Sequence, residues 1–121
     1  MFILDANMIL RYLLNDNEEM ANRAEMYIQR DDAHVTIEVM VEVVYVLSRV
    51  YKVGRRELAD ILLAFLDSIK SRDMNIIKVA VTTYGRENLD FVDCVLYAYA
   101  KVDHITVATF DKKLNRLIDS I

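Results

Sequence analysis

Proline is absent from the 121-residue sequence, and glycine occurs only twice. Because there is also no serine-rich run, no segment is a candidate linker, and residues 1–121 are predicted to form one domain with a sizeable core. Cysteine occurs once, as Cys94, which excludes an intrachain disulfide. The mostly apolar neighbours of Cys94 predict that its side chain is buried.

Long apolar runs are missing as well, although 55% of the residues are hydrophobic. Charged residues interrupt every apolar run well before it reaches the length that spans a bilayer, so no membrane segment is predicted. Met1 is followed directly by Phe-Ile-Leu-Asp, without a basic leader. We therefore expect a cytoplasmic protein with no membrane partner.

Positive charge is also in short supply. The chain has 15 Lys and Arg residues against 19 Asp and Glu residues, for a net charge of −4. This balance argues against a protein that holds nucleic acid on a broad basic surface. If several acids gather in one pocket and bind divalent cations, however, they repel phosphate only weakly. An acidic nuclease is therefore compatible with the composition.

Residues 2–14 combine a short apolar run, an acidic residue and a helix-compatible segment. Residues 2–4 are apolar without interruption, which is typical of a strand buried on both faces of a parallel sheet. Asp5 follows at the carboxyl end of that strand, where ligands bind in open α/β sheets. Asp5 is therefore a candidate for chemistry, while either Asp5 or Asn7 would also serve as the N-cap of the next helix.

Strands and helices alternate along the rest of the chain. Short apolar runs predict strands at 34–37, 75–79 and 105–108, and helical spacing predicts helices at 18–30, 38–50, 55–71, 80–86, 89–102 and 112–118. Residues 38–50 are rich in β-branched side chains, which also allows a strand, but the length of the segment favours a helix. The alternation indicates an α/β fold with a mostly parallel sheet.

Glu42 lies among valines within the helix predicted at 38–50. If its surroundings bury it, the carboxylate needs a cation, because an unpaired buried charge is strongly unfavourable. Alternatively, Glu42 faces solvent or pairs with Arg49, and the flanking valines do not decide between these possibilities. Glu38, one helical turn earlier, is interpreted as a residue of the helix start.

Four acidic residues are predicted to share one edge of the sheet. Asp5 and Asp111 each follow a strand, and right-handed crossovers place the carboxyl ends of parallel strands on the same side. Glu42 and Asp93 lie on helices that can point into this edge. Like charges that lie close together need a partner, and Mg²⁺ or Mn²⁺ suits carboxylate oxygens. The sequence therefore predicts a divalent-cation site.

The residues around these acids refine the prediction. Asp90 and Asp93 also suit ordinary helix roles, Asp90 as the N-cap and Asp93 as a first-turn acid that complements the helix dipole. His34 and His104 both precede predicted strands and so fall at the opposite edge of the sheet. Without a histidine or cysteine ligand nearby, zinc is not expected.

Taken in order, these motifs resemble the PIN domain, and most of all the small VapC-type toxins of prokaryotic toxin–antitoxin pairs. The resemblance covers essentially the full chain. It is carried by strand-Asp5-x-Asn7, by Glu42 within VEVVYVL, by Asp90-Phe-Val-Asp93, and by Thr109-Phe-Asp111-Lys-Lys-Leu. It implies a three-layer α/β sandwich, with a mostly parallel central sheet of four or five strands flanked by helices.

The resemblance also assigns roles to individual residues. It implies an endoribonuclease that holds one or two Mg²⁺ or Mn²⁺ ions and cleaves RNA, and that forms a homodimer and binds a cognate antitoxin. The core acids would be Asp5, Glu42 and Asp93, the fourth acid Asp111, the accessory acid Asp90, and the supporting polar residues Asn7 and Thr109.

Basic residues beside the acids are candidates for holding the phosphates that flank the cut. Arg11 is tied to Asp5 by one short helix, and Lys112 directly follows Asp111. Lys113 and Arg116 are interpreted as part of a solvated face.

Two other classes of function compete with the nuclease. One is an interaction protein of the same fold with weak metal binding, for which Met20, Met26, Leu63 and Tyr97 or Tyr99 are candidate exposed apolar residues. The other is a metal-dependent phosphatase or phospho-acceptor protein. The second is disfavoured because position 7 is Asn where an aspartyl-phosphate hydrolase needs an acid.

Overall fold

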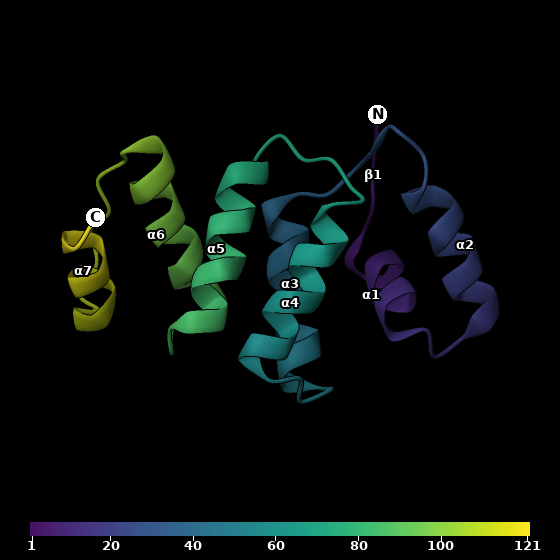
Figure 1. Cartoon of the computed structure of the whole chain (residues 1–121), viewed down its shortest axis with the longest axis horizontal. Coiled ribbons are helices and arrows are strands. Elements are labelled where there is room, and N and C mark those ends of the chain that lie inside the picture. The colour runs from purple at the N-terminus through teal and green to yellow at the C-terminus, as the bar shows by residue number, and fades with distance from the viewer.

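The computed structural model describes residues 1–121 as seven helices and two short strands (Figure 1). In chain order the elements are β1 (Phe2–Ile3), α1 (Ala6–Leu14), α2 (Glu18–Ile28), β2 (Ala33–His34), α3 (Ile37–Arg49), α4 (Arg55–Leu66), α5 (Met74–Arg86), α6 (Phe91–Asp103) and α7 (Lys112–Asp119). Their arrangement is drawn out along one axis, with α2 at one end and α7 at the other (Figure 1).

The sheet consists of two parallel strands. Phe2 of β1 pairs with Ala33 of β2, and Ile3 pairs with His34. A single bridge from His34 to Lys70 adds a third segment to the edge. The fold is thus a helix-rich α/β arrangement with a parallel sheet, and the prediction of four or five strands is wrong.

The predicted strand at 75–79 is part of a helix. Ile76, Ile77, Ala80 and Val81 are buried along α5, and their spacing is that of one helical face. The sequence prediction interpreted residues 75–79 as a separate strand, although they belong to this longer helical pattern. For the same reason it placed the start of the helix too late, at residue 80.

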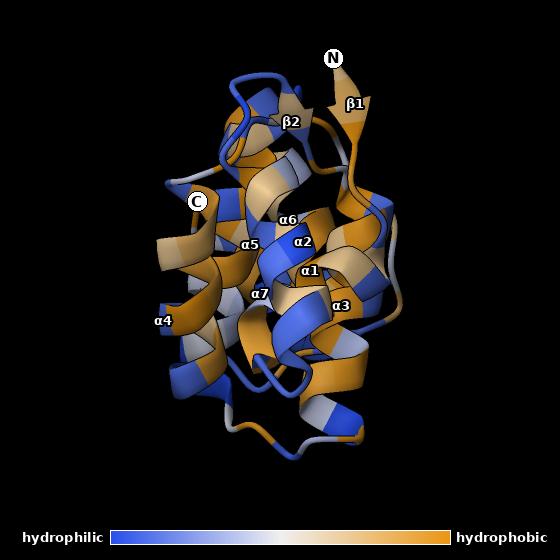
Figure 2. Ribbon diagram, turned by 90° about the vertical axis from the view of Figure 1, so that its right-hand side faces the viewer, coloured by the Kyte–Doolittle hydropathy of each residue, from blue (hydrophilic) through white to orange (hydrophobic).

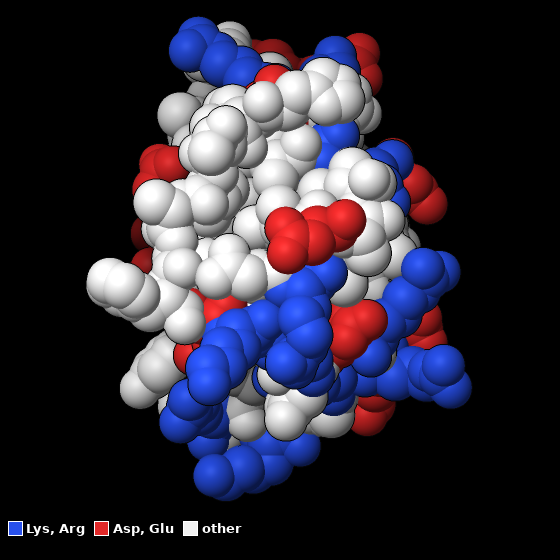
Figure 3. All heavy atoms as spheres, turned by 90° about the vertical axis from the view of Figure 1, so that its left-hand side faces the viewer, with Lys and Arg blue, Asp and Glu red and all other residues white.

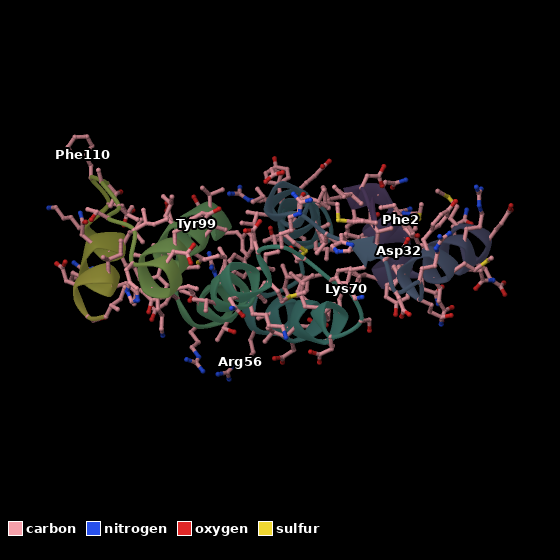
Figure 4. The ribbon with its side chains drawn as sticks, turned by 90° about the horizontal axis from the view of Figure 1, so that it is seen from above. Phe2, Asp32, Arg56, Lys70, Tyr99 and Phe110 are labelled. Atoms are coloured by element: carbon pink, nitrogen blue, oxygen red, sulfur yellow. The ribbon has the colours of Figure 1, made fainter.

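Residues 105–108 do not form the predicted strand either. No backbone group of residues 106–110 makes a hydrogen bond to another backbone group. Phe110 is fully exposed and projects away from the ribbon at the α7 end, far along the molecule from Phe2 (Figure 4). This segment therefore links α6 to α7 without joining the sheet.

The remaining helices lie close to their predicted positions because local signals define their ends. Thr36 caps α3, its side-chain oxygen accepting a hydrogen bond from the backbone N–H of Val39 at 3.2 Å. Asn17 caps α2 in the same way through the N–H of Met20 at 3.0 Å. The helix predicted at 55–71 ends earlier, at Leu66.

The core lies between the helices, where the hydrophobic residues gather, while α2 shows a mostly hydrophilic outer face (Figure 2). Cys94 is buried as predicted, and burial, its largest influence, raises the pKa of its thiol to about 12. Met20 and Met26 are exposed as predicted, whereas Tyr97 is buried. No helix is both long enough and apolar enough to span a bilayer.

Arg55, the first residue of α4, stabilises the contact between α4 and α5. The Arg55 guanidinium lies over the Tyr84 ring, with 4.3 Å between the guanidinium carbon and the ring centroid. Its Nη1 donates hydrogen bonds to the carbonyl oxygens of Tyr84, Glu87 and Leu89 at 3.2, 2.9 and 2.7 Å. Tyr84 lies in the last turn of α5, and Glu87 and Leu89 follow the end of that helix, so Arg55 also holds the turn that leads into α6.

Candidate functional site

Three carboxylates gather where α6 and α7 begin: Asp90, Asp93 and Asp111, here called the carboxylate cluster. Asp90 is the N-cap residue of α6, Asp93 lies in the first turn of that helix, and Asp111 is the N-cap residue of α7. The pKa of Asp93 is raised, first by its partial burial and then by the negative charges of Asp111 and Asp90. The cluster is therefore electrostatically unfavourable by itself, and a cation would relieve the repulsion.

Asp111 is held in place by its own helix start. One carboxylate oxygen accepts a hydrogen bond from the backbone N–H of Leu114 at 2.7 Å. The Thr109 hydroxyl accepts a hydrogen bond from the N–H of Asp111 at 3.1 Å, and Asn115 donates to the Thr109 carbonyl at 2.9 Å. Thr109 therefore contacts the backbone of Asp111, and Lys112 is exposed directly beside it.

Asp90 differs from Asp111 in its hydrogen bonding. It occupies the N-cap position of α6, but its side chain makes no capping hydrogen bond and is exposed. Asp90 therefore occupies the N-cap position that the sequence predicted, but its side chain does not cap the helix. Its carboxylate oxygens are available to a ligand.

Asp5 lies at a different place, between β1 and α1. It caps α1, with one carboxylate oxygen accepting a hydrogen bond from the N–H of Met8 at 2.8 Å. Asp5, Asn7 and Arg11 line one shallow hollow of about 170 Å³, together with Arg23. Arg11 pairs with Asp16 at 3.0 Å, and its Nε is buried without a hydrogen-bond partner. A phosphate bound in this hollow would face two guanidinium groups.

Glu42 is exposed, and the interpretation that its valine neighbours bury it is wrong. Val43, Val44 and Leu47 form the buried face of α3, and Glu42 lies outside that face. It forms no ion pair with Arg49, whose guanidinium instead lies 5.9 Å from the centroid of the Tyr45 ring. The helix itself is central, since α3 packs against both α1 and α6.

The predicted metal ligands do not converge at one point. No three acidic, histidine or cysteine side chains are placed so that they could hold a metal ion together. Asp5 is the N-cap residue of α1, and in Figure 1 the helices α3 and α4 lie between α1 and α6. The structure thus places Asp90, Asp93 and Asp111 at the starts of α6 and α7, Asp5 at the start of α1, and Glu42 on α3.

The donor chemistry of these residues suits a hard divalent cation. All five acids offer only carboxylate oxygens, which are the ligands that Mg²⁺ and Mn²⁺ prefer. Asp90 and Asp93 carry no competing hydrogen bond or ion pair from a side chain. The residues therefore fit such an ion by type, and the metal-binding role of each stays a prediction.

Residues 2–119 match the family model of the PIN domain. The chain therefore belongs to the PIN domain family, whose fold is generally that of a metal-dependent nuclease. No curated protein and no solved structure matches the chain.

The sequence prediction overlooked a set of basic residues around α5. Lys78 and Arg86 lie on α5, and Lys101 lies on the neighbouring helix α6. Lys78, Thr82 and Arg86 recur at four-residue intervals and so share one face of a helix. This signal was hidden because residues 75–79 were interpreted as a strand, in which Lys78 would not align with Arg86.

Proposed function

We propose that the chain is a metal-dependent endoribonuclease that hydrolyses RNA phosphodiester bonds and acts as the toxin of a toxin–antitoxin pair. The observation that carries the proposal is the match to the PIN domain over residues 2–119, within which Asp5, Glu42, Asp93 and Asp111 are all present. The raised pKa of Asp93, caused first by partial burial and then by the charges of Asp111 and Asp90, supports a site that receives a cation.

In this proposal the carboxylates bind the ion and accept a proton, and the basic residues bind phosphates. A divalent ion bound by the carboxylates would neutralise charge at the scissile phosphate and supply a more acidic water. A carboxylate that does not bind the ion, either Asp93 or Asp111, would take up the proton, since no histidine is predicted at the site. Arg11, in the hollow beside Asp5, and Lys112, directly after Asp111, are the basic residues that would bind phosphates of the RNA.

Cleavage of a mixed-sequence single-stranded RNA tests this proposal. The purified chain is assayed with Mg²⁺, with Mn²⁺ and with a chelator, beside the variants Asp93→Asn, Asp5→Asn and Glu42→Gln. We expect metal-dependent cleavage that falls by about 100-fold or more in each variant. Glu38→Gln is the matched control, because Glu38 is an exposed acid on the same helix as Glu42 and is outside the predicted site. It should retain full activity.

Circular dichroism establishes that each variant is folded before its activity is compared. A wild-type chain that cleaves no RNA, and that binds no Mn²⁺ in isothermal titration calorimetry, would contradict the nuclease. Loss of activity in Glu38→Gln to the same extent as in Glu42→Gln would contradict the assignment of Glu42.

A second candidate is a PIN-fold interaction protein without catalysis. It is favoured by one observation, which is that no three acids are placed to hold a metal ion. The calorimetric titration distinguishes the two candidates, since the interaction protein requires no Mn²⁺ binding at physiological concentrations of the ion.

We also propose a homodimer and a cognate antitoxin as partners. Large apolar side chains on the surface support both, in particular Met26 on α2 and Ile105 and Phe110 between α6 and α7. Side chains of this size and exposure are typical of surfaces that bind another protein. Light scattering coupled to size-exclusion chromatography tests the homodimer, and a mass of one chain at every concentration would contradict it.

A further inference from the structure

A hollow of about 340 Å³ lies between α5, α6 and α7, outside the predicted metal site. We call it the basic cleft. Its lining includes Lys78, Thr82, Arg86, Tyr97, Lys101 and Leu117. Cations and hydroxyl groups line it together with apolar groups, which is the mixture that suits an anion carrying an organic part.

The cations of the basic cleft are largely uncompensated. Arg86 and Lys101 form no ion pair, and Lys78 makes one long contact of 3.7 Å with the exposed carboxylate of Asp67. The one acid of the lining, Glu87, faces Lys113 of α7 at 4.0 Å. A chain with a net charge of −4 thus has a locally positive cleft.

The surface around α7 shows the same imbalance. Figure 3 views the molecule from the α7 end, and Lys and Arg side chains gather over the lower part of that face, with few acids among them. Lys and Arg side chains are therefore exposed on the end of the molecule that also holds the carboxylate cluster.

Along α6, the basic cleft begins one helical turn from Asp93 of the carboxylate cluster. Asp93, Tyr97 and Lys101 recur at four-residue intervals, so they lie along one face of this helix. Each interval corresponds to about 6 Å of rise. Tyr97 lines the cleft one turn beyond Asp93, and Lys101 lies a further turn along.

The length of the basic cleft favours an extended anion. Lys78 and Arg86 are eight residues apart on α5, which corresponds to about 12 Å along the helix axis. One phosphate ion would reach one of these cations, whereas a chain of phosphates would reach both. The apolar walls at Val79 and Leu117 offer contacts to a sugar or a base. A hollow bounded by three helices suits a single strand better than a duplex, which is recognised across a wide groove.

We propose that the basic cleft binds the sugar–phosphate backbone of single-stranded RNA on one side of the scissile bond. The strand would run from the carboxylate cluster past Tyr97, with its phosphates on Lys101, Arg86 and Lys78. This inference rests on the proposed nuclease function and specifies where that substrate lies. It predicts a binding site that works without catalysis.

Fluorescence anisotropy of a short labelled single-stranded RNA, measured in chelator so that no cleavage occurs, tests the inference. The test variant is Arg86→Gln with Lys101→Gln, since neither residue has an ion pair whose loss would disturb the fold. The matched control is Lys70→Gln with Arg72→Gln, which removes two exposed cations from the segment between α4 and α5, where Lys70 lies well away from α7 (Figure 4). Both double variants change the net charge equally.

We expect the test variant to bind RNA about tenfold more weakly, with a salt dependence shallower by about 1.4 in log–log slope for two lost phosphate contacts. The control should stay within about twofold of wild type. Inorganic phosphate, added as competitor at the same phosphate concentration as the RNA, should not displace the RNA. Displacement at that concentration would identify the cleft as a site for free phosphate and overturn the proposal.

Equal weakening in the two double variants would also overturn it, because binding would then depend on net charge alone. The result of this binding test can be distinguished from the result of the cleavage test of the nuclease. A chain that cleaves RNA in metal but binds it equally well in both variants refutes only the basic cleft. A chain that never cleaves, yet loses RNA binding selectively in Arg86→Gln with Lys101→Gln, refutes only the nuclease.

Discussion

Gly85 lies where α4 and α5 come closest, and its replacement tests the packing of the helix that forms one wall of the basic cleft. A Cβ atom at position 85 would lie 2.7 Å from the Cβ of Ala59 on α4. Carbon atoms do not approach this closely without strain, so Gly85→Ala must push the two helices apart. Helix propensity acts in the opposite direction, since alanine is favoured over glycine by about 1 kcal/mol within a helix.

The balance of these two effects sets the expected result. Overpacking of this kind costs about 1–3 kcal/mol, so Gly85→Ala should lower the free energy of unfolding by about 1 kcal/mol net. Urea denaturation followed by circular dichroism measures this change. Ala59→Gly removes the opposing Cβ atom and should relieve the strain in the Gly85→Ala background.

A double-mutant cycle measures the coupling free energy between positions 59 and 85. The two substitutions should be non-additive by about 1–2 kcal/mol, in the direction that makes Ala59→Gly less harmful when position 85 is alanine. If Gly85→Ala stabilises the protein by its helix propensity alone, or if the two changes are additive, α4 and α5 are not in the close contact described above.

Three further predictions concern buried and titrating groups. Arg55→Met should lower the free energy of unfolding by about 2–4 kcal/mol, measured by urea denaturation. The reason is that the carbonyls of Tyr84, Glu87 and Leu89 lose their charged donor. A loss below about 1 kcal/mol would mean that water replaces the guanidinium. Asp111→Asn should lower the pKa of Asp93, since it removes one of the charges that raise this pKa. A carbon-13 NMR titration of the carboxyl groups measures the pKa of Asp93. An unchanged pKa would mean that Asp111 is too far away to affect Asp93. Cys94 should stay protonated in the folded chain up to a pKa of about 12, while the unfolded thiol ionises near its ordinary value of 9.0. Its contribution to stability is therefore complete below pH 9.0 and is lost as the pH rises toward 12. Between these values wild type should lose stability more steeply than Cys94→Ala, and parallel curves would refute the shift.

Several elements could be predicted from the sequence because local interactions specify them. Asp5, Asn17, Thr36 and Asp111 each cap the helix that follows, and the capping hydrogen bond joins residues only three positions apart. The helices α2, α3 and α7 accordingly begin within a residue of where the sequence places them, and α1 is capped by Asp5 and not by Asn7. Among the candidate acids, Asp5 and Asp111 lie at helix starts for the same local reason.

Strand pairing could not be predicted in the same way. Residues 75–79 and 105–108 have the composition of strands, yet only β1 and β2 pair. A strand exists only where a neighbouring chain segment supplies its hydrogen bonds, and residues 106–110 have no such neighbour. Composition records the preference of a segment and contains no information on its partner.

The sequence by itself determined the membership of the chain in an acid-bearing α/β family, through the order of Asp5, Glu42, Asp93 and Asp111. It could not determine which way Glu42 faces, because valines surround it in sequence on both sides while α3 buries only one face. The tertiary structure alone decided that Asp111 lies beside Asp93 and apart from Asp5, and that Lys78, Arg86 and Lys101 line one cleft. The physical reason is that charges act through space: helix packing sets the distances between them, and sequence separation does not.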